Sequence, residues 1–312
     1  LDVTAYKTYT ENQLFSLEIS TTTGYSKLYV NAGKVTNKGI ELALGFKQNI
    51  GPVDWKTTLL WSLNRNRIDQ LLSEYTNEEL GVTVHLDEMD VYSLGGAKQR
   101  LTVGGSMGDV YVNTMRTDEH GHIWMNSMTG TLETDKNNYV YAGNTNPKYT
   151  LSWRNEFNWK GISLGFMLNA RVGGIGVSAT QAVMDYYGVS KTSAEARDNG
   201  GVKVNGQMID AQTWYQTIGA NGTGYVGSMY VYSMTNVRLG ELTLGYDIPI
   251  NKWCKWISGL NVSFVGRNLW MLYCKAPFDP ESTASTGTYN QGMDYFMQPS
   301  LRSMGFSAKI SF

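Results

Sequence analysis

Apolar and polar side chains alternate one by one along much of this chain. In the stretch 149–159, one set of alternate positions holds Tyr149, Leu151, Trp153, Phe157 and Trp159. The positions between them hold Thr150, Ser152, Arg154, Glu156 and Asn158. A period of two residues is that of a β-strand, whose successive side chains point to opposite faces of a sheet. The stretch is therefore predicted to be a strand with one apolar and one polar face.

The same alternation recurs in pairs of segments joined by turn residues. Lys160-Gly161 separates 149–159 from a second alternating stretch at 162–172, and Gly51-Pro52 separates 40–46 from 55–63. Two alternating runs joined by such a turn predict a β-hairpin. Further strands are predicted over 260–264 and 304–312. Between 237 and 248 the apolar positions change from odd to even, which predicts a β-bulge near Gly240.

Alternation by itself also describes a soluble β-sandwich or a propeller, so the lengths of the strands and of their connections matter. The predicted strands run to about 10–16 residues, against a mode of about 5–6 in soluble proteins. Such strands are long enough to cross a membrane at a tilt. Short connections near 50–53, 159–161 and 249–256 alternate with long ones over 16–35, 69–98, 173–227 and 272–299. Short turns on the periplasmic side and long external loops are typical of outer-membrane barrels.

Tryptophan and tyrosine residues lie near both ends of the predicted strands. Those beside the short turns are Trp55, Trp159, Tyr246, Trp253 and Trp256, and those towards the long loops are Trp61, Trp270, Tyr230 and Tyr232. Amphipathic rings favour the headgroup level of a membrane, so two such bands indicate aromatic girdles. We therefore predict an all-β protein, a transmembrane antiparallel β-barrel.

Composition supports this prediction and narrows the partners. Charged residues make up 17% of the chain, against about 25% in typical globular domains. No uncharged apolar run approaches the roughly 18 residues that a spanning helix needs. The formal net charge is −1, so neither a nucleic acid nor an acidic membrane surface has electrostatic support as a partner.

Short motifs occur in a fixed order along most of the chain. They are VNAGKVTNKGIE at 30–41, NRNRI at 64–68, GNTNPKY at 143–149, Gly173-Gly174, VRL at 237–239, LTLGYDIP at 242–249, GRNL at 266–269, PFDPE at 277–281 and PSLRS at 299–303. Together they resemble the SusC/RagA family of TonB-dependent outer-membrane transporters.

The resemblance implies an importer of the outer membrane rather than an enzyme. Such a protein captures a nutrient under a SusD-like surface lipoprotein and carries it past a plug with energy from the TonB complex. The cargo implied is an oligosaccharide, or else a peptide. The resemblance also implies that residues 1–312 are a partial barrel domain, the C-terminal eight to ten of 22 strands, with the plug, the TonB box and the earlier strands outside it. A passive porin or a structural or adhesive barrel is the alternative, and a soluble β-rich binding protein comes third.

The last strand sets the expected direction of the chain. It ends in the aromatic Phe312, and the assembly machinery of outer-membrane barrels commonly reads such an end. With that end in the periplasm, the segments 69–98, 173–227 and 272–299 are external. The region 99–146 then holds an even number of spanning strands, either none or a pair that turns at 118–121. We expect the pair, and hence ten strands.

Candidate functional residues are few, and none forms a catalytic constellation. His120 and His122 beside Asp118 and Glu119 are residue types that ligate metals, but a solvated turn is the simpler interpretation, and no metal or cofactor is expected. The polar faces of the strands are expected to line the lumen, where they bind solute or plug or simply hold water. Their charged and amide residues are Glu41, Lys47, Lys56, Arg154, Glu156, Asn169, Arg171, Arg238, Glu241, Arg267 and Lys309.

Aromatic residues in the long loops are the candidates for substrate contact. They are Tyr186, Tyr187, Trp214, Tyr215, Tyr225, Tyr289, Tyr295 and Phe296. Flat rings stack on sugar faces, although the same rings also pack loops against one another or against a lid. Asp279 is a further candidate for substrate contact. Asp279 and Glu281 are also carboxylates suited to a cation, but the prolines Pro277 and Pro280 beside them favour a rigid turn.

Overall fold

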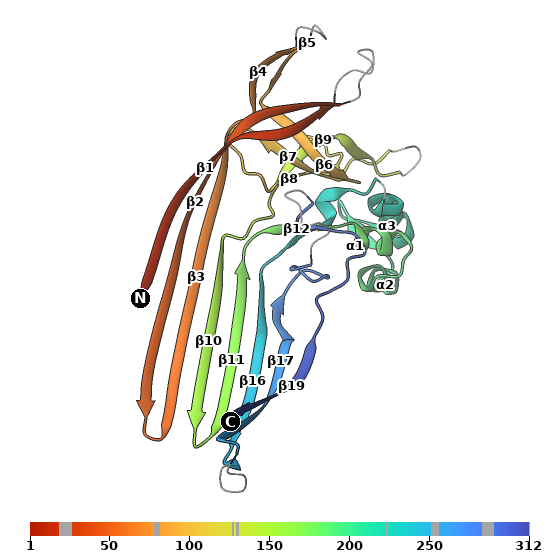
Figure 1. Ribbon diagram of the computed structural model, residues 1–312. Coiled ribbons are helices and arrows are strands. Elements are labelled where there is room, and N and C mark those ends of the chain that lie inside the picture. Colours follow the sequence, from red (N-terminus) through yellow and green to blue (C-terminus); the bar gives the residue numbers. More distant parts are fainter. Residues whose placement is uncertain are drawn as a thin grey trace.

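The computed structural model describes residues 1–18, 27–77, 82–126, 128, 131–222, 224–250, 256–282 and 290–311 (Figure 1). Its largest element is an eight-stranded sheet with the order β1-β2-β3-β10-β11-β16-β17-β19 and antiparallel pairing throughout. The strands are β1 (Asp2–Glu18), β2 (Lys27–Ile50), β3 (Val53–Gln70), β10 (Tyr149–Trp159), β11 (Ile162–Val172), β16 (Asn236–Ile248), β17 (Gly259–Cys274) and β19 (Ser303–Ser311). Among the described residues, no helix is long and apolar enough to cross a membrane.

The pairing register joins the alternating patterns of separate strands into two continuous faces. Leu59 of β3 lies opposite Leu44 of β2 and opposite Trp153 of β10. Farther along the sheet, Leu244 of β16 lies opposite Leu164 of β11 and Phe264 of β17. We call this side the apolar face and the other side the polar face.

The apolar face is exposed along the whole sheet. Leu44 is 42% exposed, Phe46 50%, Leu244 52% and Phe306 85%. So large an exposed apolar surface is unstable in water and marks contact with a partner or with lipid. The sheet is the wall of a transmembrane β-barrel, with its apolar face towards the lipid.

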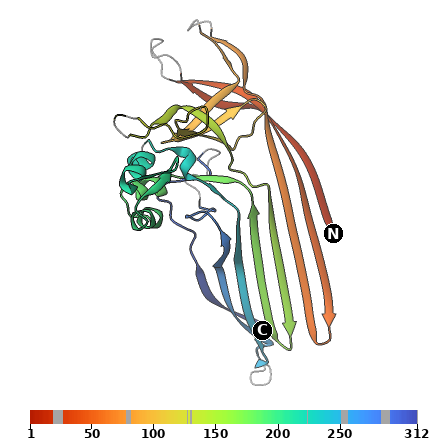
Figure 2. The same cartoon turned by 180° about the vertical axis from the view of Figure 1, so that it is seen from behind.

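The predicted hairpins and the bulge are confirmed. Strands β2 and β3 turn at Gly51-Pro52, and β10 and β11 turn at Lys160-Gly161, where Lys160 and Gly161 have φ values of 47° and 87°. The register of β16 skips Gly240 against both neighbours, between Leu239 and Glu241. Both turns lie at one end of the sheet, which we call the turn end, and we call the opposite end the loop end (Figures 1 and 2).

Two expectations about the sheet are wrong. Among the described residues, the region 99–146 adds no spanning pair, so the wall has eight strands and not the expected ten. Its strands β7 (Ala97–Thr102), β8 (Asp109–Met115) and β9 (Thr134–Asn144) instead join β6 (Glu88–Leu94) in a separate sheet with the order β6-β7-β8-β9, and the turn at 118–121 lies outside the wall. The loop expected over 16–35 is largely strand, because β1 and β2 stay paired as far as Glu18 and Lys27. The sequence predicts the pair over 99–146 only from the parity of spanning strands, and it predicts a loop over 16–35, because neither segment shows by itself which strands it pairs with.

The connections at the loop end fold into a module of their own, which we call the loop-end module. Its strands are β4 (Leu72–Asn77), β5 (Val82–Leu86), β6 (Glu88–Leu94), β7 (Ala97–Thr102), β8 (Asp109–Met115), β9 (Thr134–Asn144), β12 (Ile175–Ser178), β13 (Val202–Val204), β14 (Gln207–Ile209), β15 (Val231–Ser233) and β18 (Met293–Asp294). Its α-helices are α1 (Ala179–Tyr186), α2 (Lys191–Asp198) and α3 (Ala211–Gly219), with 3₁₀ turns η2 (Ala220–Gly222) and η3 (Gly227–Tyr230).

Each α-helix of the module begins at a side chain that accepts a backbone N–H. Ser178 accepts from Gln181, Ser190 from Ser193 and Asp210 from Thr213. Such N-caps satisfy donors that have no partner inside the helix. Strand alternation does not reveal these helices, because each is only eight or nine residues long.

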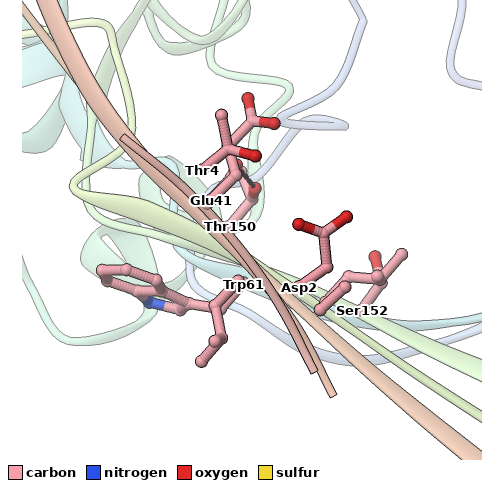
Figure 3. Close-up of a pocket in the computed structure, with 10 residues that line it drawn as sticks. Asp2, Thr4, Glu41, Trp61, Thr150 and Ser152 are labelled. Carbon is pink, nitrogen blue, oxygen red and sulfur yellow. Dashed lines mark hydrogen bonds between the residues drawn. The ribbon is translucent and has the colours of Figure 1, made fainter. Parts of the chain in front are cut away.

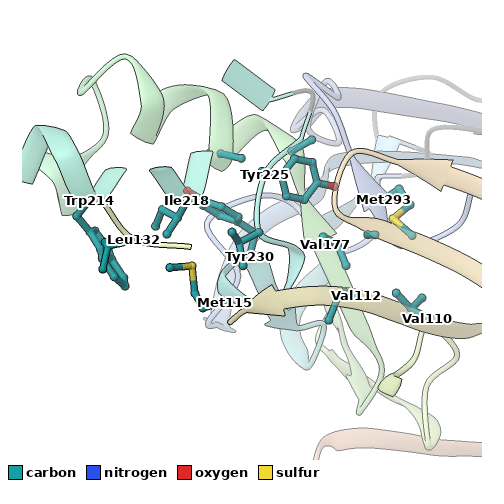
Figure 4. Packing of buried hydrophobic residues seen from close by; sticks show 14 of the residues in the cluster. Val110, Val112, Met115, Leu132, Val177, Trp214, Ile218, Tyr225, Tyr230 and Met293 are labelled. Atoms are coloured by element: carbon teal, nitrogen blue, oxygen red, sulfur yellow. The ribbon is translucent and has the colours of Figure 1, made fainter. Parts of the chain in front are cut away.

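The module has a core that draws on segments far apart in sequence. Val112 of β8, Val177 of β12, Ile218 of α3 and Tyr230 of η3 pack together (Figure 4). Tyr230 is 1% exposed, and Tyr232 packs partly buried against the same core. These two tyrosines therefore do not belong to a membrane girdle, contrary to the sequence expectation.

Candidate functional site

The polar face of the wall carries a groove of about 390 Å³ across β1, β2, β3 and β10. One cross-strand row of its lining is Thr4, Glu41, Ser62 and Thr150, and the next row includes Asp2 and Ser152. The hydroxyls of Ser62 and Thr150 lie 2.8 Å apart. Trp61 projects to the opposite side of the sheet (Figure 3). Hydroxyl and carboxylate groups therefore meet in rows because the register aligns them, and they can hydrogen-bond a polar solute or a polar protein surface.

The charged residues predicted for the lumen all lie on this polar face. Arg154 Nε lies 2.7 Å from Glu156 Oε1, and Arg267 Nε lies 3.3 Å from Glu241 Oε2. The pairs are largely exposed, with Arg154 at 55% and Arg267 at 69%. Exposed pairs contribute only about 0–1 kcal/mol to stability. Their effect is to balance charge along a wetted wall.

Arg238 lies on the same face, but its environment differs from that of the other charged residues. Its side chain is 5% exposed, and Nη2 donates to Asp279 Oδ1 at 2.9 Å while Nη1 lies 3.3 Å from Glu281 Oε2. Nη1 also donates to Asn268 Oδ1 and to Ser300 Oγ. We call these five residues the Arg238 cluster. Four of the sequence motifs, at 237–239, 266–269, 277–281 and 299–303, meet in it.

The carboxylate of Asp279 is engaged within this cluster. Its side chain is 8% exposed, and it accepts hydrogen bonds from the hydroxyl and backbone N–H of Ser300 and from the backbone N–H of Glu281. Burial raises the pKa of Asp279, but the hydrogen bonds from Ser300, Glu281 and Arg238 outweigh it and lower the pKa to about 2. Asp279, a candidate for substrate contact, thus fixes a loop instead of facing an open surface.

Arg171 reaches from the top of β11 into the module. Its Nη2 donates to the backbone carbonyl of Thr145 at 2.6 Å. Its buried Nε has no hydrogen-bond partner among the described residues. Arg171 therefore anchors the 143–149 motif to the wall.

Two pairs of aromatic rings, one of them containing the half-buried Tyr186, flank helix α1. The rings of Tyr186 and Tyr187 meet edge to face at 5.1 Å, and so do those of Tyr295 and Phe296. The backbone N–H of Phe296 donates to Thr180 Oγ1 at 2.6 Å, which holds the second pair to the first turn of the helix. Tyr187, Tyr295 and Phe296 are 63%, 53% and 57% exposed. Their faces remain available to a ligand or a partner.

A crevice of about 200 Å³ opens beside the first pair, between α1, α2 and α3. It brings together three aromatic candidates with polar groups, and its lining includes Tyr186, Tyr187, Tyr215, Asp185, Arg197 and Gln216. Tyr187 donates from its hydroxyl to Asn221 Oδ1 at 2.9 Å. The crevice is small, so it suits one sugar ring or one side chain.

The other aromatic candidates are placed differently. Trp214 and Tyr225 are 8% and 0% exposed and belong to the core of the module. They are not offered to a ligand, because α3 and the segment after it turn them inward. Tyr289 lies outside the described residues.

The histidine pair lies in an exposed turn. His120 and His122 donate their backbone N–H groups to Asp118 Oδ1 at 2.9 and 2.8 Å. These bonds lower the pKa of Asp118 and shape the turn. Within the described ranges, no group of three or more His, Cys, Asp and Glu residues is placed to hold a metal ion.

Asn155 was missed by the sequence analysis, although it interrupts the apolar positions of β10. It lies on the apolar face and is 1% exposed. Trp55 Nε1 donates to Asn155 Oδ1 at 3.1 Å, and Trp153 Nε1 donates to Thr57 Oγ1 at 2.9 Å. These bonds fix two indole rings on the lipid side of the wall.

The comparisons with known proteins agree with this geometry. No family model matches the chain. Two proteins of Formosa agariphila, TonB-dependent receptor P3 and TonB-dependent receptor P26, are each 22% identical over 98% and 97% of the chain. The chain spans about a third of their length, 32% in both cases.

Solved structures show the same fold. The structure of the RagAB peptide transporter superposes with a TM-score of 0.65 at 16% identity over 98% of this chain and 32% of that one. The RagAB peptide importer in the 'open-open' state gives 0.61 at 17% identity over 99% and 32%. The resemblance stated from the motifs is confirmed: the relatives that match nearly the whole chain are named TonB-dependent receptors, and the chain has the fold of part of RagAB.

Proposed function

We propose that this chain forms part of the membrane wall, and the loop-end module above it, of an importer in the bacterial outer membrane that is driven by TonB. In this proposal residues 1–312 are a partial barrel domain, and the plug and the remaining strands are supplied by other parts of the same protein. The observation that carries the proposal is the two-faced eight-stranded wall capped at one end by a folded module. An open sheet of this kind leaves unpaired edges, which lipid does not tolerate, so further strands must complete it.

The turn end is assigned to the periplasm and the loop end to the exterior. The turn-end connections β2–β3 and β10–β11 are two residues long, whereas the module at the other end holds three helices. This asymmetry is that of outer-membrane barrels. The polar groove and the charged pairs of the polar face then line the path between plug and wall.

The cargo is proposed to be an oligosaccharide, bound first at the two aromatic pairs beside α1. Tyr186, Tyr187, Tyr295 and Phe296 offer ring faces, and Asn221, Gln216 and Arg197 lie nearby with polar groups. A peptide is the competing cargo, because RagAB is described as a peptide transporter. A peptide would contact the same rings, so a binding experiment has to distinguish an oligosaccharide cargo from a peptide cargo.

A SusD-like surface lipoprotein is the proposed partner at the loop end. The motif resemblance and the likeness to RagAB support it. Exposed apolar side chains of the module, among them Tyr187, Val189 and Tyr295 at 63%, 72% and 53% exposure, are available for such a lid.

Import is tested in cells that express the parent protein, by which we mean the full protein that contains this chain. Uptake of a fluorescent oligosaccharide is expected to require TonB and to stop in a strain without it. The coding sequence that precedes Leu1 is expected to specify a plug and a TonB-contact segment. If it specifies neither, or if the protein conducts ions steadily in planar bilayers, a passive porin or adhesive barrel replaces the importer.

The substrate surface is tested by binding to the purified parent protein with and without its co-purified partner. The probes are maltoheptaose, xylohexaose, an alginate oligosaccharide and casein-derived peptides. Each lost stacking ring is expected to weaken binding by about 0.5–1.5 kcal/mol, so Tyr186→Ala with Tyr187→Ala is expected to cost about tenfold. Tyr246→Ala, which alters an exposed tyrosine at the turn end, is the matched control. Equal affinity in both variants removes the aromatic pairs from the proposal, and binding of peptides alone replaces the oligosaccharide.

A further inference from the structure

A row of basic side chains stands directly above the apolar face on three neighbouring strands. On β2 and β3 the cross-strand pairs of the apolar face run from Ile50 and Val53 at the turn end to Ile40 and Leu63. The next pair on the same face is Lys38 and Arg65, and Lys7 of β1 continues the row. On each of the three strands, the first side chain beyond the apolar face is therefore a cation.

The height of this change agrees with the edge of a membrane. Ten residues from Ile50 to Ile40 span about 33 Å along a strand. At a tilt of about 40° this is about 25 Å of membrane thickness, the height of the apolar band in outer-membrane barrels. The Lys7–Lys38–Arg65 row thus lies at the headgroup level of the leaflet on the loop-end side.

The basic side chains also share a cavity. Lys7, Lys38, Arg65 and Arg67 line a hollow of about 370 Å³ together with Tyr9, Thr36, Asn66 and Asp69. Arg65 and Arg67 also border a second hollow of about 700 Å³, in which Lys148, Tyr141 and Asn144 take part. A pair of adjoining hollows with cations on their walls is large enough for phosphorylated sugar headgroups.

Carboxylates of the protein neutralise only a minor part of the positive charge in and around this hollow. Lys34 lies 2.8 Å from Glu11, and Arg67 Nε lies 3.8 Å from Asp69 Oδ1. Within the part of the chain that the structure describes, Arg65 donates only to the backbone carbonyls of Asn64 and Pro147, both at 3.3 Å. Lys7 stands 4.6 Å above the ring of Tyr9. No carboxylate among the described residues pairs with Lys7, Lys38 or Arg65, so their charge is available to an anion.

We propose that the patch of Lys7, Lys38, Arg65 and Arg67 binds a phosphorylated glycolipid headgroup of the outer leaflet. Cations close to a membrane surface attract anionic headgroups, and guanidinium groups bind phosphate through two parallel hydrogen bonds. The ligand is lipid-borne because the patch continues the lipid-facing surface. The inference rests on the barrel standing in the membrane and holds whether or not the protein imports a nutrient. The chain's net charge of −1 conceals the patch, since the strand register brings four cations to one hollow whose described lining holds a single carboxylate, that of Asp69.

The test is native mass spectrometry of the parent protein in nanodiscs that contain bis-phosphorylated lipid A in zwitterionic lipid. Lys38→Gln with Arg65→Gln and Arg67→Gln is expected to reduce retained lipid A by about tenfold to a hundredfold. The control is Lys47→Gln with Lys56→Gln, a cross-strand pair on the same two strands but on the polar face. The control is expected to retain lipid A as the wild type does.

A second variant and two further ligands test whether the patch binds the phosphate groups of a lipid. Lys7→Gln with Lys38→Gln breaks no side-chain hydrogen bond or ion pair among the described residues and is expected to weaken retention about tenfold while heat-modifiable gel mobility stays unchanged. Dephosphorylated lipid A is expected to bind weakly, and inorganic phosphate is expected not to displace the lipid. Equal retention of the dephosphorylated lipid, full displacement by inorganic phosphate, or equal losses in the Lys47 and Lys56 control each overturn the proposal.

Discussion

The guanidinium of Arg238 on β16 donates to the carboxylate of Asp279 at 2.9 Å across 41 residues of sequence, and both side chains are more than nine-tenths buried. The pair joins the barrel wall to the loop that follows β17. Breaking a buried pair leaves one charge without a partner, whereas an exposed pair contributes little. The Arg238–Asp279 pair is therefore predicted to contribute more to the free energy of unfolding than the exposed ion pairs of the described residues.

Replacing Arg238 with Met is expected to destabilise the parent protein by about 3–5 kcal/mol, because Asp279 stays buried and charged. Equilibrium urea unfolding in detergent, followed by tryptophan fluorescence, measures the change. The double variant Arg238→Met with Asp279→Leu is expected to recover part of the loss. Lys191→Gln, which removes an exposed pair with Glu195, is the control at about 0–1 kcal/mol. A loss equal to that of the control would show that the cluster contributes nothing beyond a surface pair.

The Asp279 pair is also expected to respond to acid. The folded pKa of Asp279 is about 2, below the ordinary value of 3.8, so the contribution is complete above pH 3.8 and is lost as pH falls towards 2. Hydrogen exchange of residues 277–281 and 299–303, corrected for intrinsic rates, is expected to be faster in Asp279→Asn than in the wild type near neutral pH. That difference is expected to shrink markedly as the pH falls from 3.8 to about 2. A difference that persists unchanged at that pH would contradict the assignment, and Glu195→Gln is expected to show none at any pH.

Gly96→Ala is expected to loosen the loop-end module. A Cβ at Gly96 would lie 1.9 Å from the carbonyl oxygen of Tyr225 and 2.6 Å from the backbone nitrogen of Gly227. Backbone atoms cannot move aside cheaply, so the cost is expected to be about 1–3 kcal/mol or more. Protease resistance of the module measures it. Gly45→Ala, where a Cβ meets nothing within 4 Å, is the matched control and is expected to change little.

Asn155→Ala is expected to cost about 1–3 kcal/mol, because the indole N–H of Trp55 then loses its acceptor on the apolar face. Unfolding in detergent measures the loss, and Asn158→Ala, at an exposed position of the same strand, is the control. Asn155→Leu combined with Trp55→Phe removes donor and acceptor together. That variant is expected to be closer to the wild type than Asn155→Ala, and the reverse order would refute the role of the hydrogen bond.

Local pattern alone was enough for the strands and their faces. In a strand with one lipid-facing side, apolar and polar side chains alternate. From this alternation, 149–159 and 162–172 could be identified as strands, their turn located and the bulge at Gly240 found from the sequence alone. The side of the sheet on which Arg154, Arg171, Arg238 and Arg267 lie follows from the same period of two.

Tertiary structure determines which strands pair and which distant segments pack together. The strands of 97–144 pair with each other in the loop-end module and not with the wall, so the described wall has eight strands instead of ten. Trp214 and Tyr230 are buried because α3 packs on α1 and η3 packs on β8 and β12, contacts that no local pattern encodes. The Arg238 cluster and the basic patch also depend on the pairing and packing of segments that are distant in sequence. Alternation is a property of one strand, whereas register and packing are relations between segments, and only the folded chain satisfies them together.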